Sequence, residues 1–134
     1  HFVVDRDGKV YQLSDTDRIT WHAGRSEWRG VKGLNAHAIG IEIANYGWQD
    51  GTRKLPDGIK WFTGKKLKHK NGGKAMLWED YPEMQLVAVD KLVRWLDKTY
   101  PTLYEIVGHD DIAPGRKSDP GPAFPMERYI DVLT

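Results

Sequence analysis

The chain has 134 residues, of which 40% are hydrophobic and 29% charged, and this ordinary globular usage argues against disorder. Twenty Lys and Arg against nineteen Asp and Glu leave a net charge of +1, which argues against a general nucleic-acid binder. There is no Cys, so any metal has to be held by His and carboxylate side chains. No apolar run approaches the ~20 residues that cross a bilayer, and the opening at His1 is not typical of a secretory signal. We therefore expect one domain over residues 1–134, with no transmembrane segment and no nucleic-acid partner.

The first predicted element is a β-hairpin. Two short apolar runs, Phe2–Val4 and Val10–Leu13, flank the pair Asp7-Gly8. Glycine adopts the positive φ that tight turns require, so these runs are expected to pair as strands.

The clearest strand of the sequence covers residues 38–44. By the period of two, Ile39, Ile41 and Ile43 fall on one face of this strand, and Glu42 falls on the other. We expect the strand to be central in its sheet, with its isoleucines beneath a helix.

Residues 48–80 differ in character from the rest of the chain. Between Lys60 and Lys74 lie six lysines and no acidic residue, and Gly is frequent. We expect a long surface insertion that can contain a short hairpin, rather than a linker between domains. Loops this long in a compact domain are often functional.

One helix is predicted from about residue 81 to 99. Its buried stripe follows helical spacing and consists of Val89, Leu92, Val93 and Leu96. Asp80 is the expected N-cap, with Glu83 completing a capping box, and Pro101 ends the helix.

The end of the chain is predicted to hold a short strand at Glu105–Val107 and a short helix from about Met126. Together the elements indicate an α/β fold, a single domain with a central mixed β-sheet flanked by helices.

The stretch from Gly108 to Gly121 carries the strongest candidates for chemistry. His109 follows the predicted strand, and Asp119 stands ten residues further on, after a loop rich in Pro and Gly. Zinc accepts both residue types, and a catalytic zinc takes three protein ligands and a water molecule. In an extended segment Lys117 projects to the same side as Asp119, where it can stabilise charge on a substrate oxygen. The alternative is a rigid loop whose aspartates cap turns and whose lysine is solvated.

Glu42 is the second candidate. A carboxylate between two isoleucines is costly unless it faces a cleft or a partner, and strand interiors disfavour Glu. It can serve as a general base that takes a proton from a metal-bound water. The alternative, equally open, is a Glu on a solvent-facing sheet surface.

The other histidines and the tryptophans are weaker signals. His22 can bind a ligand or a metal, but holding a loop by hydrogen bonds is the commoner role of such a residue. We expect His37 and His69 at the surface, because neither has a companion at ligand spacing. Some of the six tryptophans can stack on a sugar ring from loops, namely Trp21, Trp28, Trp61 and Trp78.

Several motifs together resemble a known family. They are, in chain order, Asp7-Gly8-Lys9-Val10-Tyr11-Gln12, Trp21-His22-Ala23-Gly24, Asn35 followed by Ile39-Gly40-Ile41-Glu42, and Gly108-His109 through Asp119-Pro120-Gly121-Pro122. The combination resembles the zinc-dependent N-acetylmuramoyl-L-alanine amidases of the type 2 family, which share a fold with peptidoglycan recognition proteins. The resemblance covers nearly the whole chain outside residues 48–80.

The resemblance implies an activity, a cofactor and roles for four residues. The family hydrolyses the amide between the lactyl group of N-acetylmuramic acid and the L-alanine of the stem peptide. Peptidoglycan or a muropeptide is therefore the expected substrate, and Zn²⁺ the expected cofactor. By the resemblance, His109 and Asp119 match two of the three zinc ligands. Glu42 matches the general base, and Lys117 matches the cation that stabilises the oxyanion.

The resemblance also assigns substrate-binding residues. Trp21, His22 and Asn35 are expected to line the substrate groove, and Arg6 is expected to contact carboxylates of the peptide. The family's remaining zinc ligand lies on an opening strand, whereas His1 aligns with a later residue. We therefore expect that strand and the helix after it to be missing from this chain.

The retained site residues favour an enzyme over the alternative, a non-catalytic module of the same fold that binds muropeptides. A phosphate or nucleic-acid binder that uses the lysines of residues 60–74 is much less favoured. The same lysines could steer the domain toward an anionic cell wall.

Overall fold

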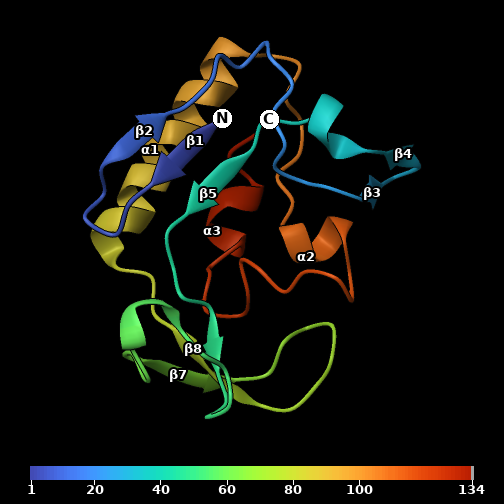
Figure 1. Cartoon of the computed structure of the whole chain (residues 1–134). Helices are drawn as coiled ribbons and strands as arrows, with labels where there is room; N and C mark the ends of the chain where they lie inside the picture. The colour runs from blue at the N-terminus through green and yellow to red at the C-terminus, as the bar shows by residue number, and fades with distance from the viewer. Residues whose placement is uncertain (134) are drawn as a thin grey trace.

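The structure is a computed structural model that describes residues 1–133, the side chain of Asp57 excepted. Its first sheet consists of β1 (Phe2–Val4), β2 (Val10–Gln12) and β5 (Ile41–Ile43) in the order β2-β1-β5 (Figure 1). β1 pairs antiparallel with β2 and parallel with β5, so the predicted hairpin and the mixed sheet are confirmed. The expectation that residues 38–44 form the central strand was wrong, because both other strands pair with β1 and β5 lies at an edge of the sheet.

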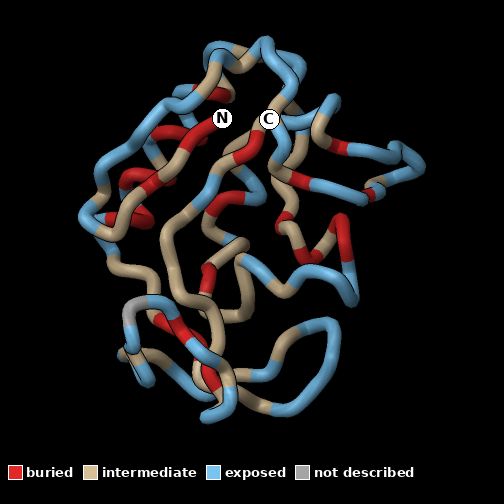
Figure 2. The backbone as a smooth tube through the Cα atoms, in the orientation of Figure 1, coloured by how far each residue is buried: buried red, intermediate tan, exposed pale blue. Residues whose placement is uncertain are grey.

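α1 (Glu83–Thr99) covers one face of this sheet, as the buried segments in Figure 2 show. The predicted stripe is confirmed, since its four residues are buried together with Leu86. The stripe packs on Phe2 and Val4 of β1 and on the partly buried isoleucines of residues 39–43. Removing such apolar area from water supplies roughly 25 cal/mol per Å², so this layer is the main source of the stability of the fold.

The start of α1 differs from the prediction. Pro82, with φ −60° and ψ 144°, is the N-cap residue, and no side chain in the described part of the chain caps the helix. Proline starts a helix well because its φ is already set and it has no N–H to satisfy. Asp80 is used otherwise, because its carbonyl accepts from Arg6 and its carboxylate lies 3.7 Å from the ammonium of Lys65.

The predicted C-terminal helix is confirmed as α3 (Glu127–Ile130). Tyr129 is only 1% exposed, and its ring stacks on Phe124 at 5.2 Å between centroids. Its hydroxyl donates to the carbonyl of Leu86 at 2.9 Å, so α3 is fastened directly to α1.

Residues 48–80 form a second sheet of three antiparallel strands rather than a plain surface insertion. The strands are β6 (Trp48–Gln49), β7 (Gly64–Leu67) and β8 (Met76–Glu79), in the order β6-β8-β7. The hairpin of β7 and β8 agrees with the prediction, but Trp78, expected on a loop, lies on β8 and is 2% exposed. A Cβ on Gly64 would stand 2.0 Å from the carbonyl oxygen of Trp78, so only glycine permits this close pairing.

Half of the six lysines in residues 60–74 are paired with acids from elsewhere in the chain. Lys65 lies near Asp80, Lys70 contacts Asp110 and Asp111, and Lys74 contacts Asp50 at 3.0 Å. These ion pairs weaken the local positive field on which a polyanion would depend.

The remaining elements are η2 (Pro56–Gly58), between β6 and β7, and β3 (Glu27–Trp28), β4 (Val31–Lys32), η1 (Leu34–Ala36) and α2 (His109–Ile112). Glu105–Val107 does not form the predicted strand, because within residues 1–133 it has no partner strand to complete a ladder. Glu105 instead accepts hydrogen bonds from Trp28 and Arg29 at the β3–β4 hairpin. None of the helices in the described chain has the length and apolar character needed to span a membrane.

Candidate active site

The loop that begins with α2 brings His109 and Asp119 together. Nδ1 of His109 lies 3.1 Å from Oδ2 of Asp119, and the backbone N–H of Asp110 donates to the carbonyl of Asp119 at 2.8 Å. Gly108 makes the closure possible, since a Cβ there would stand 2.4 Å from Oδ1 of Asp110 and 2.9 Å from Cδ of Pro120. The structure therefore brings the two predicted zinc ligands together. The same geometry is compatible with the alternative, a rigid loop without a metal.

The hydrogen bonds of His109 suit a metal ligand. Its Nε2 lies 3.0 Å from the carbonyl oxygen of Ala23, which can only accept, so in the neutral ring Nε2 carries the proton. Nδ1 then turns its lone pair toward the carboxylate of Asp119, which is 59% exposed. A ligating histidine typically donates its other ring N–H to a carbonyl in this way. Two ligands of one tetrahedral zinc lie about 3.3 Å apart, close to the observed separation.

His109 and Asp119 are a pair rather than a full ligand set. In the part of the chain that the structure describes, no three His, Asp or Glu side chains gather as a metal site would require. The ring of His1 is engaged elsewhere, since Nδ1 accepts from the N–H of Gly40 at 3.0 Å and Nε2 lies 2.7 Å from the carbonyl of Arg18.

Asn35 anchors the loop that holds His109. Its Oδ1 accepts from the backbone N–H groups of His22, Ala23 and Gly24, at 3.0, 2.7 and 3.2 Å. This loop presents the carbonyl of Ala23, which accepts from both His109 and Arg116. The structure thus gives Asn35 a positioning contact that sequence reasoning missed, and its place in a substrate groove stays a prediction.

His22 holds a loop, the commoner of its two expected roles, and also lies near His109. Its Nε2 stands 3.2 Å from the carbonyl oxygen of Ala38, and its side chain packs closely on Gly40, where a Cβ would be 2.4 Å from Cγ. Burial is the main cause that lowers the pKa of His22, and nearby His109 acts in the same direction.

Glu42 lies on the sheet face that points away from the α1 core. Ile41 and Ile43 pair with Phe2 and Val4, whose side chains are buried under α1, so Glu42 projects from the opposite face, as predicted. Gly40, two residues earlier, shares that face, and His22 packs on it. The exposed Glu42 therefore projects from the same face of the sheet as His22, and the loop of His22 contacts His109 through the carbonyl of Ala23.

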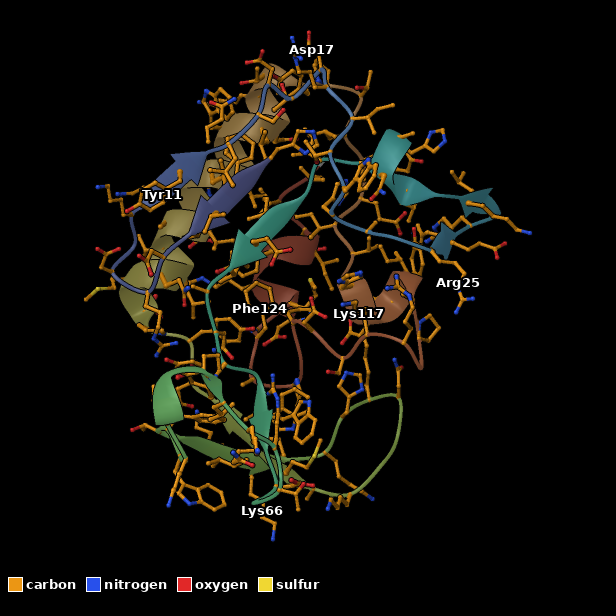
Figure 3. All side chains as sticks on the ribbon, viewed as in Figure 1. Tyr11, Asp17, Arg25, Lys66, Lys117 and Phe124 are labelled. Atoms are coloured by element: carbon orange, nitrogen blue, oxygen red, sulfur yellow. The ribbon has the colours of Figure 1, made fainter. Side chains whose placement is uncertain are left out.

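Lys117 and Trp21 are both exposed beside this region. Lys117 follows α2, and Figure 3 shows it close to that helix. Its side chain forms no ion pair within the described residues, and its backbone N–H donates to the carbonyl of Ala113 at 2.9 Å. Trp21 is 94% exposed, and Trp61 is also exposed, so both rings are accessible for stacking.

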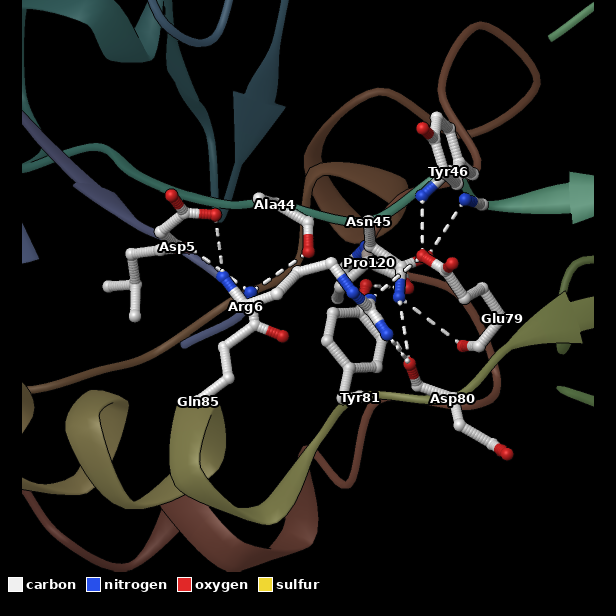
Figure 4. A network of polar contacts seen from close by, with 12 residues as sticks. Asp5, Arg6, Ala44, Asn45, Tyr46, Glu79, Asp80, Tyr81, Gln85 and Pro120 are labelled. Atoms are coloured by element: carbon white, nitrogen blue, oxygen red, sulfur yellow. Dashed lines mark hydrogen bonds and ion pairs between the residues drawn. The ribbon is translucent and has the colours of Figure 1, made fainter. Parts of the chain in front are cut away.

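Arg6 lies in a polar network that joins the two sheets (Figure 4). Its guanidinium donates to Glu79 at 2.9 Å and to the carbonyl of Asp80, and Glu79 also accepts from the N–H of Tyr46. These bonds use donors of both terminal nitrogens of the guanidinium. The contact of Arg6 with carboxylates of the peptide stays a prediction. Tyr81 links the network to the His109 loop, since its hydroxyl donates to the carbonyl of Pro120 at 2.7 Å.

His69 was expected at the surface, and this was wrong. Its side chain is 8% exposed and contacts Asp110, the neighbour of His109. The contact joins residues 41 positions apart, and no local pattern of the sequence signals it. His37 is exposed, as expected.

The mixed sheet with one helical core face, the His–Asp pair and the exposed Glu on the opposite sheet face define the class as an α/β domain with a candidate site on that face. Residues 1–122 match the family model described as N-acetylmuramoyl-L-alanine amidase. The chain belongs to this family.

Two relatives of the chain also have names of amidases. The chain is 35% identical over 121 residues to the N-acetylmuramoyl-L-alanine amidase AmiD of Escherichia coli (strain K12), a match that covers 90% of this chain and 36% of the relative. It is 35% identical over 133 residues to the 1,6-anhydro-N-acetylmuramyl-L-alanine amidase AmpD of Enterobacter cloacae, covering 98% of this chain and 55% of that protein. The chain thus spans about half of these relatives' length or less.

Solved structures show the same fold. A complex of E. coli AmiD with the substrate anhydro-N-acetylmuramic acid-L-Ala-D-gamma-Glu-L-Lys matches with a TM-score of 0.73 and 30% identity, over 96% of this chain and 45% of that one. AmpDh3 from Pseudomonas aeruginosa in complex with anhydromuramic pentapeptide matches with a TM-score of 0.66 and 33% identity, over 90% and 40% of the two chains.

Proposed function

We propose that this protein hydrolyses the amide between N-acetylmuramic acid and L-alanine in peptidoglycan or its muropeptide fragments, with zinc as cofactor. The observation that supports this most directly is the His109–Asp119 pair in a chain that belongs to the amidase family. The complex of the relative AmiD with an anhydro-muramyl peptide supports a substrate of this class.

The donor atoms of the pair suit zinc. Nδ1 of His109 and a carboxylate oxygen of Asp119 would hold the ion, and the carbonyl of Ala23 would keep the imidazole in the required tautomer. When bound, zinc polarises a carbonyl and lowers the pKa of a bound water to about 7.

The other roles fall to residues of the chain itself. Glu42 accepts the proton of the attacking water, because its carboxylate is exposed on the site's side of the sheet and forms no hydrogen bond within the described residues. Lys117, which forms no ion pair in the part of the chain that the structure describes, carries a positive charge two residues before Asp119, where it stabilises the negative oxygen that forms as the amide is attacked. Trp21 offers an open ring face to the sugar.

Product analysis by mass spectrometry tests the proposal. A purified muropeptide incubated with the protein should release free stem peptide, a chelator should stop the release, and added zinc should restore it. Glu42→Gln should bind the muropeptide yet lose about 10²–10⁴-fold in turnover. Glu27→Gln, at an exposed position on β3, is the matched control and should stay active.

Two outcomes would contradict the proposal. Binding without release of stem peptide would indicate the alternative, a module that recognises muropeptides without cleaving them. Turnover of Glu42→Gln equal to that of Glu27→Gln would remove Glu42 from the reaction.

A further inference from the structure

The loop between β7 and β8, residues 68–75, leaves the second sheet and reaches toward α2 (Figure 1). Three of its residues contact the loop that carries His109 and Asp119, and they are His69, Lys70 and Asn71. The second sheet therefore contacts the loop of the candidate site through these residues, in addition to Trp78, on which Gly121 packs.

The imidazole of His69 is held in a defined orientation and tautomer. Its Nδ1 accepts from the N–H of Asn71 at 3.0 Å, so the proton of the neutral ring is on Nε2. Nε2 lies 3.0 Å from Oδ2 of Asp110 and 3.0 Å from the carbonyl oxygen of Ser118, both of which accept. The ring packs near Trp78, with 5.8 Å between centroids.

These two acceptors lie next to the two proposed ligands. Asp110 directly follows His109, and Ser118 directly precedes Asp119. A single N–H group of His69 therefore bridges both ends of the loop, beside the bond from the Asp110 N–H to the Asp119 carbonyl.

Two further contacts hold Asp110 in place. Asn71 donates from Nδ2 to the backbone carbonyl of Asp110 at 3.1 Å, and the ammonium of Lys70 lies 3.4 Å from its Oδ1. The carboxylate of Asp110 is only 4% exposed, and among the described residues its Oδ1 has no hydrogen-bond partner. Loss of the His69 donor would leave this buried carboxylate still less satisfied, which favours a shift of the backbone around it.

We propose that His69 is a positioning residue for the amidase site, which it serves by fixing the separation of His109 and Asp119 through Asp110 and Ser118. This inference rests on the proposed function and gives the second sheet a role in it. Small misplacements of reacting groups are costly, on the order of 10²-fold in rate for about 1 Å. Loss of an outer hydrogen bond in a metal site typically costs about 10–100-fold.

A matched pair of variants tests the proposal. His69→Phe keeps an aromatic ring near Trp78 but has no donor, whereas His69→Gln places an N–H donor near the position of Nε2. Lys68→Ala, at an exposed position of the same loop, is the control. The readouts are hydrogen exchange at the Asp110 amide, followed by NMR, and kcat and KM for muropeptide hydrolysis.

For His69→Phe we expect about tenfold faster exchange at Asp110 and about a tenfold lower kcat, with KM unchanged within about twofold. His69→Gln should recover most of the kcat, and Lys68→Ala should match the wild type. Asn71→Ala, at an exposed position, should shift both readouts in the same direction by about threefold, and it replaces His69→Phe if that variant does not fold.

Wild-type kcat and exchange in His69→Phe would overturn the positioning role, and so would a His69→Gln variant no better than His69→Phe. A wild-type protein that binds muropeptide but never cleaves it would instead contradict the proposed function. In that case the exchange rates still decide whether His69 holds the loop.

Discussion

Replacing Asn35 by Ala should destabilise the protein and loosen the candidate site together. The substitution removes the one oxygen that accepts from the N–H groups of His22, Ala23 and Gly24. The carbonyl of Ala23, which orients His109, would lose its support.

The size of the effect follows from these contacts. Each hydrogen bond contributes about 0.5–1.5 kcal/mol, and three donors that share one oxygen do not contribute in full. Ala23 is buried while Gly24 is exposed, so water replaces only part of what is lost. We expect Asn35→Ala to lower the free energy of unfolding by about 2 kcal/mol.

Urea denaturation followed by circular dichroism measures this difference, with Asn35→Asp as the matched variant. Aspartate keeps an acceptor oxygen at the same position, and the amide nitrogen of Asn35 makes no hydrogen bond in the described chain, so Asn35→Asp should lose less than about 0.5 kcal/mol. Equal destabilisation in both variants, or none in Asn35→Ala, would refute the anchoring role. Weakened muropeptide binding in a stable Asn35→Asp would instead show that the amide itself contacts substrate.

Other substitutions test separate parts of the structure. Gly40→Ala should displace the His22 ring and cost about 1–3 kcal/mol by overpacking, measured by urea denaturation; an unchanged midpoint would contradict the contact. Trp21→Ala should change the free energy of unfolding by less than about 0.5 kcal/mol, because the side chain is exposed. Stacking of the Trp21 ring on the sugar predicts that muropeptide binding, measured by calorimetry, weakens by about 1 kcal/mol. Unchanged affinity would exclude Trp21 as a stacking surface for the sugar. Burial raises the pKa of Tyr129 to about 12, whereas a tyrosine in the unfolded chain has a pKa of about 10. The free energy of unfolding should therefore fall as the pH rises from about 10 to about 12. Tyr129→Phe should flatten that fall and cost about 1 kcal/mol at neutral pH through the lost bond to Leu86, and an equally steep alkaline loss would contradict the assignment.

The parts of the fold that could be predicted are those with a local periodic signal. The isoleucines of residues 39–43 alternate, and the apolar stripe of α1 has helical spacing, so both core faces were identified correctly. The second sheet could not be predicted in the same way. Its strands have two to four residues, and the burial of Trp78 depends on neighbours that are distant in the sequence.

In the candidate site, too, the residues with a local sequence signal could be predicted and those that act through tertiary contacts could not. The His109–Asp119 loop was identified from its residue types and spacing, because the loop itself brings the two ends together. The supports of that loop come from elsewhere: Asn35 acts through the loop of residues 22–24, and His69 acts across 41 positions. Contacts of this kind depend on tertiary packing, so no motif in one sequence reveals them.

Hydrolysis in ¹⁸O-labelled water is the measurement that tests the central claim most directly. Attack on the lactyl amide predicts that one ¹⁸O atom enters the carboxylate of the muramyl product, while the stem peptide leaves with an unlabelled L-alanine amino terminus. Label in the peptide, or intact muropeptide after incubation with zinc-loaded protein, would contradict an amidase that acts at this bond.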